Sequence, residues 1–146
     1  MQIDQFTYST FSAVSELIVT AIVLWVIFDN FRGNRLRAGW LFGTLAFELL
    51  VNVSYMVKQT FVVFENRTAE TPAYIELVGA FHGILSLGMF VALIVVAVLA
   101  YRASKRGVAY FQGRPALTGV FVVLWMLSIL SGEWLYYEIH LKYLLG

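Results

Sequence analysis

The chain has 146 residues, of which 60% are hydrophobic and only 13% charged, and its net charge is +1. A soluble domain carries about a quarter of charged residues, so this composition excludes an ordinary water-soluble protein. The small net charge excludes a basic face for nucleic acid. The absence of cysteine excludes disulfides and thiolate metal sites. The length allows a single domain, residues 1–146.

Four apolar segments are each long enough to cross, as a helix, a hydrocarbon core of about 30 Å. They cover residues 11–31, 38–61, 75–101 and 116–140. Pro72 and Pro115 fall in connections, just ahead of the third and fourth segments, where a missing N–H does no harm. The sequence therefore predicts an all-α membrane protein, a bundle of four transmembrane helices.

The basic residues predict the orientation of this bundle. Of the ten lysine and arginine residues, three lie toward one side of the membrane: Lys58, Arg67 and Lys142. The other seven lie in the first and third connections: Arg32, Arg35, Arg37, Arg102, Lys105, Arg106 and Arg114. Basic connections stay in the cytoplasm, so we expect both termini to lie outside. Asp29, beside the arginines of the first connection, is expected to form a local ion pair.

Ionisable residues inside the apolar segments are the candidates for function, because a charge in the bilayer is costly and by default faces the bundle interior. One lies in each segment: Glu16, Glu48, His82 and Glu133. Polar neighbours at helical spacing extend each position into a stripe. These neighbours are Ser12, Thr20, Asn52, Tyr55, Tyr136, Tyr137 and His140.

The depth of each group follows from counting about 1.5 Å per residue from the nearest basic connection. The count places five residues in one layer of the outer half of the membrane: Glu16, Asn52, Tyr55, His82 and Glu133. Glu48 falls below this layer and His140 about 9 Å above His82. We expect the side chains of the layer to face a shared interior.

Three ligands suit such a layer. Carboxylates and imidazoles bind copper, iron or zinc in helical bundles, with His82, Glu16, Glu48, Glu133 and His140 as candidate metal ligands. A haem b with two axial histidines has only the pair His82 and His140, whose depths differ. A quinone would use hydrogen bonds from His, Tyr and Glu, so His82, His140, Tyr55 and Tyr136 are the candidate cofactor-binding residues.

The structural alternative assigns these residues no ligand. A lone membrane Glu can stay neutral and hydrogen-bond to a neighbouring helix. Gly79, Gly83 and Ser86, near His82, are typical of a close-packing helix face. No nucleophile with a placed histidine and no phosphate-binding loop occurs, so we predict no catalytic residue and expect the chain to have no enzymatic activity of its own.

Residues 80–107 and 114–137 resemble the C-terminal half of a small prokaryotic family of integral membrane proteins linked to maturation of haem-copper terminal oxidases. The resemblance is carried by an early histidine, a short basic connection and a final helix with a Trp-x-x-Ser-x-x-x-Gly pattern. Here these residues are His82, Trp125, Ser128, Gly132, Tyr136 and His140. The resemblance implies a multi-pass protein of the prokaryotic cytoplasmic membrane.

The function expected from the sequence joins the polar layer to this resemblance. It is a respiratory-chain-associated membrane protein with an outward-facing site for a metal ion or haem. The resemblance implies service to a terminal oxidase, in assembly or as an electron-transfer accessory. The alternative is a non-catalytic accessory subunit that packs against a larger membrane complex and binds lipid, pigment or quinone.

Overall fold

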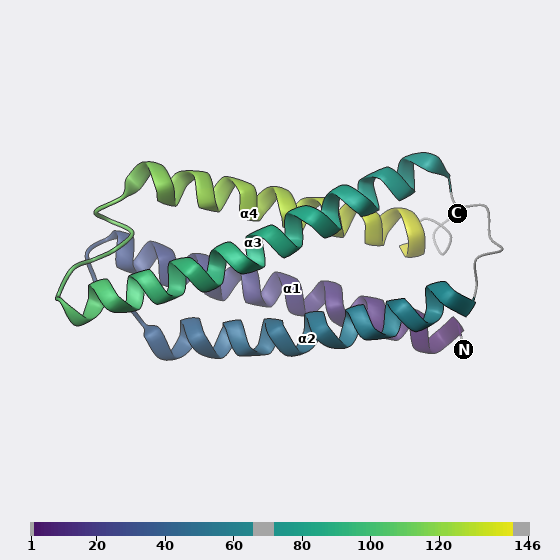
Figure 1. Ribbon diagram of the computed structural model, residues 1–146, viewed down its shortest axis with the longest axis horizontal. Coiled ribbons are helices and arrows are strands. Elements are labelled where there is room, and N and C mark those ends of the chain that lie inside the picture. Colours follow the sequence, from purple (N-terminus) through teal and green to yellow (C-terminus); the bar gives the residue numbers. More distant parts are fainter. Residues whose placement is uncertain (1, 66–71, 142–146) are drawn as a thin grey trace.

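The computed structural model is all-α over the residues that it describes, which are 2–65 and 72–141. Side chains are described at residues 7, 9–51, 54 and 72–139. Helices α1 (Gln2–Phe31), α2 (Ala38–Glu65), α3 (Ala73–Lys105) and α4 (Pro115–Tyr136) run side by side along the long axis (Figure 1). A π-helical turn, η1 (Tyr137–Leu141), continues α4.

The helices form a closed up-and-down bundle. The contacting pairs are α1 with α2, α2 with α3, α3 with α4, and α4 with α1. Short connections make neighbours in the chain antiparallel neighbours in space. The α1–α2 and α3–α4 connections therefore lie at one end, and α1 begins and η1 ends at the other (Figure 1).

The predicted segments correspond to these helices, but the helices extend beyond the apolar stretches. α1 begins at Gln2 rather than near Phe11, and α3 continues to Lys105. Hydropathy marks the part that fits in hydrocarbon, whereas backbone hydrogen bonding continues into the interface. Pro72 is the N-cap of α3 and Pro115 the first residue of α4, as predicted for residues that cannot donate a backbone N–H.

Three described helical stretches are long and apolar enough to cross a membrane: Ser9–Phe31, Ala73–Lys105 and Pro115–Ile139. In α2 the stretch Ala38–Val51 is apolar but shorter. Large hydrophobic side chains cover the outside, as Ile84 at 77% and Leu77 at 72% exposure illustrate. Hydrocarbon, rather than water, is the solvent that suits this surface.

The core lies in the half of the bundle nearer the basic connections. Helices α1, α3 and α4 each present one stripe to it at helical spacing. The stripes contain Val19, Val23, Val26 and Ile27 of α1, Met89, Leu93, Ala97 and Ala100 of α3, and Phe121, Trp125 and Ile129 of α4. Trp125 donates from Nε1 to Thr20 Oγ1 at 3.2 Å, so this buried polar pair also fixes α4 against α1.

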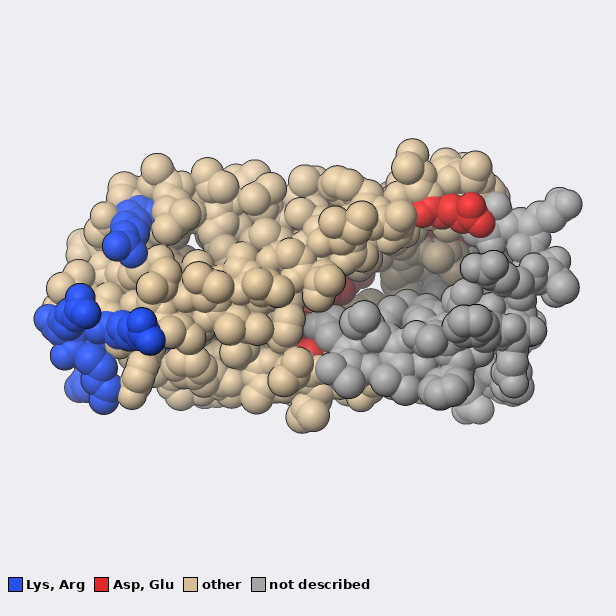
Figure 2. Space-filling view, viewed as in Figure 1, with Lys and Arg blue, Asp and Glu red and all other residues tan. Residues whose placement is uncertain are grey.

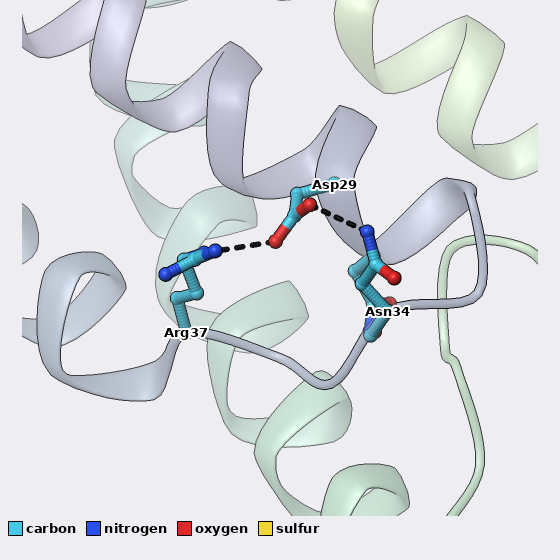
Figure 3. Close-up of polar contacts among 4 residues, drawn as sticks. Asp29, Asn34 and Arg37 are labelled. Carbon is cyan, nitrogen blue, oxygen red and sulfur yellow. Dashed lines mark hydrogen bonds and ion pairs between the residues drawn. The ribbon is translucent and has the colours of Figure 1, made fainter.

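The α1–α2 connection is held by Asp29, which confirms the predicted ion pair. Arg37 Nε lies 2.9 Å from Asp29 Oδ2, and Asn34 Nδ2 donates to Asp29 Oδ1 at 2.7 Å (Figure 3). The Arg37 guanidinium also lies 4.8 Å from the centre of the Trp25 ring. One carboxylate thus closes the turn and holds an arginine at the membrane boundary.

All described lysine and arginine side chains lie at the end with the two connections (Figure 2). Lys58, Arg67 and Lys142 fall outside the described side chains. The structure therefore shows a charged end and an apolar body, and the assignment of that end to the cytoplasm is a prediction from the charge bias.

Cysteine labelling tests this orientation. We expect single cysteines at Thr68 and Gly146 to react with a membrane-impermeant maleimide in intact cells, and a cysteine at Lys105 to react only after lysis. The natural chain has no cysteine, so the background is zero. Labelling of the Lys105 variant from outside would reverse the assignment.

Candidate functional site

Two of the predicted carboxylates, Glu16 of α1 and Glu48 of α2, line one small cavity between the helices. The volume of about 20 Å³ is room for about one water molecule. The other lining residues come from α3 and α4: Ser86, Met89, Phe90, Trp125, Ser128 and Ile129. Acidic atoms are visible at the base of a hollow near the middle of the face in Figure 2. We call this space the carboxylate cavity.

Counting residues placed Glu48 below the layer of Glu16, yet both reach the same cavity. The count treats each helix as parallel to the membrane normal, whereas real helices tilt. The predicted partners on α2, Asn52 and Tyr55, have side chains outside the described residues.

Glu133 of α4 is the third carboxylate of this region. Glu16 lies within electrostatic range of both Glu48 and Glu133. Among the described residues, Glu133 Oε1 is a buried side-chain oxygen without a hydrogen-bond partner. A buried polar atom in this state needs a proton, a water molecule or an ion. Glu16 and Glu48 thus share one cavity, and Glu133 lies within electrostatic range of Glu16; the predicted layer of five polar residues stays a prediction.

The chemistry of such a group follows from its surroundings. Ionised carboxylates repel one another, and the low dielectric constant of a membrane interior strengthens that repulsion. A positive charge held among them, whether a proton or a small cation, removes the repulsion. The carboxylate cavity is thus suited to a cation and unsuited to an anion.

His82 of α3 is directed at α4 rather than at this cavity. Its Nδ1 lies 3.1 Å from Ser128 O and 3.0 Å from Ser131 Oγ. Ser131 Oγ in turn donates to Ser128 O at 2.8 Å. The imidazole therefore joins α3 to one turn of α4.

Gly132 makes this contact possible. A Cβ added at Gly132 would lie 2.6 Å from His82 Cε1 and 3.2 Å from Nε2. The ring therefore packs against the bare α4 backbone. Gly79 and Gly83 belong to the predicted close-packing face of α3. A Cβ added at either glycine would meet no described atom within 4 Å. Among the described residues, those two glycines therefore pack against no neighbouring helix, and the close-packing face stays a prediction.

The candidate cofactors can be compared with this geometry. Within the described residues, no three His, Asp or Glu side chains lie close enough together to hold one metal ion. The ring of His82 packs on α4: its Nδ1 is hydrogen-bonded to Ser128 and Ser131, and its Cε1 and Nε2 are turned toward Gly132. A haem bound through His82 stays a prediction.

The remaining candidate residues lie toward the chain termini. The side chain of His140 is outside the described residues, so the pair His82 and His140 stays a prediction. Tyr136 OH forms a hydrogen bond of 2.7 Å with Thr10 Oγ1, which ties the end of α4 to α1. This contact gives Tyr136 a structural partner on α1.

Ser131 is the site residue that the sequence analysis missed, while Ser128 and Gly132 entered only through the resemblance. The signal was present in the sequence. Ser128, Ser131 and Gly132 lie within one turn of α4 in an otherwise apolar helix, which is typical of a face that accepts a polar side chain from a neighbouring helix.

Fold and site together define a small helical membrane protein with an internal carboxylate cavity. No protein-family model matches the chain, and no curated protein or solved structure matches it either. The resemblance to the oxidase-maturation family therefore stays a prediction, and the functional argument rests on the residues themselves.

Proposed function

We propose that this chain is a membrane-embedded accessory protein that holds one small cation among Glu16, Glu48 and Glu133. The observation that carries the proposal is the convergence of Glu16 and Glu48 on one cavity, with Glu133 within electrostatic range. The unpaired oxygen of Glu133 supports it further. The cation is a proton shared with one water molecule, because no three described acidic side chains lie close enough together to hold a metal ion.

The setting of this site is part of the same proposal. The protein spans the prokaryotic cytoplasmic membrane four times, with both termini outside, and the cavity communicates with the outer side. It serves a terminal oxidase of the respiratory chain, in assembly or as an accessory to electron transfer. The support for the oxidase is the resemblance of residues 80–107 and 114–137, and the support for the orientation is the distribution of basic residues.

Metal analysis and infrared spectroscopy of the purified chain test the cation. We expect the carbonyl stretch of a neutral carboxyl group and no stoichiometric metal ion at the three carboxylates. Glu16→Gln and Glu48→Gln should each remove that signal, because the amide carries no charge to be balanced. The outcome that contradicts the proposal is a metal-free protein in which all three carboxylates are ionised.

Glu76→Gln is the matched control. Glu76 is an exposed carboxylate in the first turn of α3, away from the cavity lining. It removes the same charge as the cavity variants, so its metal content and infrared spectrum should match those of the unmodified chain. A change equal to that of Glu16→Gln would indicate a general charge effect.

A second candidate is an accessory subunit without a bound cation that packs against a larger membrane complex. Gly79 and Gly83, which meet no described atom, favour it, since small residues four apart let another membrane helix approach closely. If this candidate is correct, the infrared spectrum shows no neutral carboxyl group, and the exposed face of α3 becomes the site of interest.

A further inference from the structure

A second pocket lies at the basic end of the bundle, between the end of α3 and the start of α4. It has a volume of about 410 Å³, within the range of small-molecule sites. Three arginines line it: Arg102 in the last turn of α3, Arg106 at the C-cap of α3, and Arg114 at the N-cap of α4. Leu99 and Val108 supply an apolar wall. We call this space the arginine pocket.

The three guanidinium groups have no acidic partner among the described residues. The ion pair found at this end joins Arg37 to Asp29 in the other connection. Arg114 is held in place by Tyr110, with its guanidinium carbon 4.6 Å from the ring centre. The stacking orients the planar group without neutralising its charge. Three uncompensated positive charges therefore surround one concave space.

The α3–α4 connection, which supplies part of the lining of the arginine pocket, is anchored in the core. Phe111, only 1% exposed, donates its backbone N–H to Asn30 Oδ1 of α1 at 3.2 Å. Thr118 Oγ1 donates to Phe111 O at 3.1 Å and to Arg114 O at 2.9 Å. The α3–α4 connection is thus anchored to α1 and α4, and the site is formed before any ligand arrives.

We propose that the arginine pocket binds the phosphate headgroup of an anionic membrane lipid. Guanidinium groups form paired, charge-assisted hydrogen bonds with phosphate oxygens. The position of the arginines, at the end of apolar helices and beside Leu99 and Val108, sets the headgroup at the interface and leaves an acyl chain against the hydrophobic surface. A free phosphate would use the arginines and leave the apolar wall uncovered.

Native mass spectrometry of the purified full chain tests this site with phosphatidylglycerol and phosphatidylcholine of matched acyl chains. We expect a preference of about tenfold or more for phosphatidylglycerol, since each basic residue near an anionic lipid strengthens the binding of that lipid. The triple variant R102Q/R106Q/R114Q should lose the preference to within about twofold. Inorganic phosphate should fail to displace the lipid, and efficient displacement would overturn the lipid assignment.

The matched control removes three charges from the same end without touching the pocket lining: R32Q/R35Q/K105Q. This variant should keep the preference, and an equal loss would overturn the proposal in favour of bulk charge. The variant R102K/R106K/R114K keeps the positive charges that orient the chain in the membrane but lacks the planar guanidinium groups. It replaces the glutamine variant in this test if that variant does not insert into the membrane. It should show a weaker preference than the natural chain, and an undiminished one would also overturn the proposal.

Discussion

A Gly132→Ala variant is expected to lose the contact between His82 and α4 and to unfold more easily, by about 1–3 kcal/mol. The added Cβ would lie 2.6 Å from His82 Cε1, a separation that forces the ring or the helix to move. Moving the ring breaks the hydrogen bonds from Nδ1 to Ser128 O and Ser131 Oγ. Unfolding of the purified chain in mixed micelles, followed by tryptophan fluorescence, measures the loss.

Gly119→Ala on the same helix is the control, because a Cβ there meets no described atom. It should leave stability unchanged or raise it, as alanine favours a helix over glycine. A double-mutant cycle with His82→Ala isolates the contact, since the cost of Gly132→Ala should disappear once the ring is gone. Equal costs with and without the imidazole would show that the ring does not pack on Gly132.

An Asn30→Leu variant is expected to destabilise the basic end by about 1–3 kcal/mol, because it leaves a buried donor without an acceptor. Asn30 is 2% exposed. Its Oδ1 accepts from Phe111 N and its Nδ2 donates to Asn34 O at 2.9 Å. Leucine has a similar size but offers neither group, so the backbone N–H of Phe111 stays unsatisfied inside the bundle.

The measurement is the same unfolding experiment, with Asn34→Leu as the control. Asn34 is exposed, and its side chain donates to Asp29 Oδ1 on the exposed surface of the connection. Water replaces that bond when it is lost, so we expect a change below about 1 kcal/mol. A control variant as unstable as Asn30→Leu would mean that the connection between α1 and α2, rather than the link to Phe111, supplies the stability.

Several features followed from the sequence because they depend on neighbouring residues in the chain. Long apolar runs and two prolines in the connections predicted the helices and placed the starts of α3 and α4. Asp29 and Arg37, which form the ion pair, are only eight residues apart in the chain. A single short connection is therefore enough to bring them together. The positions of Glu16, Glu48 and Glu133 were informative because any ionisable group in hydrocarbon requires a partner or an interior place.

The contacts between helices were decided by tertiary structure. Helical periodicity places His82 on a face, but the rotation and tilt of α3 against α4 direct the ring to Ser128, Ser131 and Gly132 instead of to the carboxylates. The packing of α2 against α1 brings Glu48 to the cavity of Glu16. These angles result from side chains packing across distant segments, and no local pattern encodes them. For that reason the sequence determined which groups this protein carries into the membrane, and the bundle determined which of them meet.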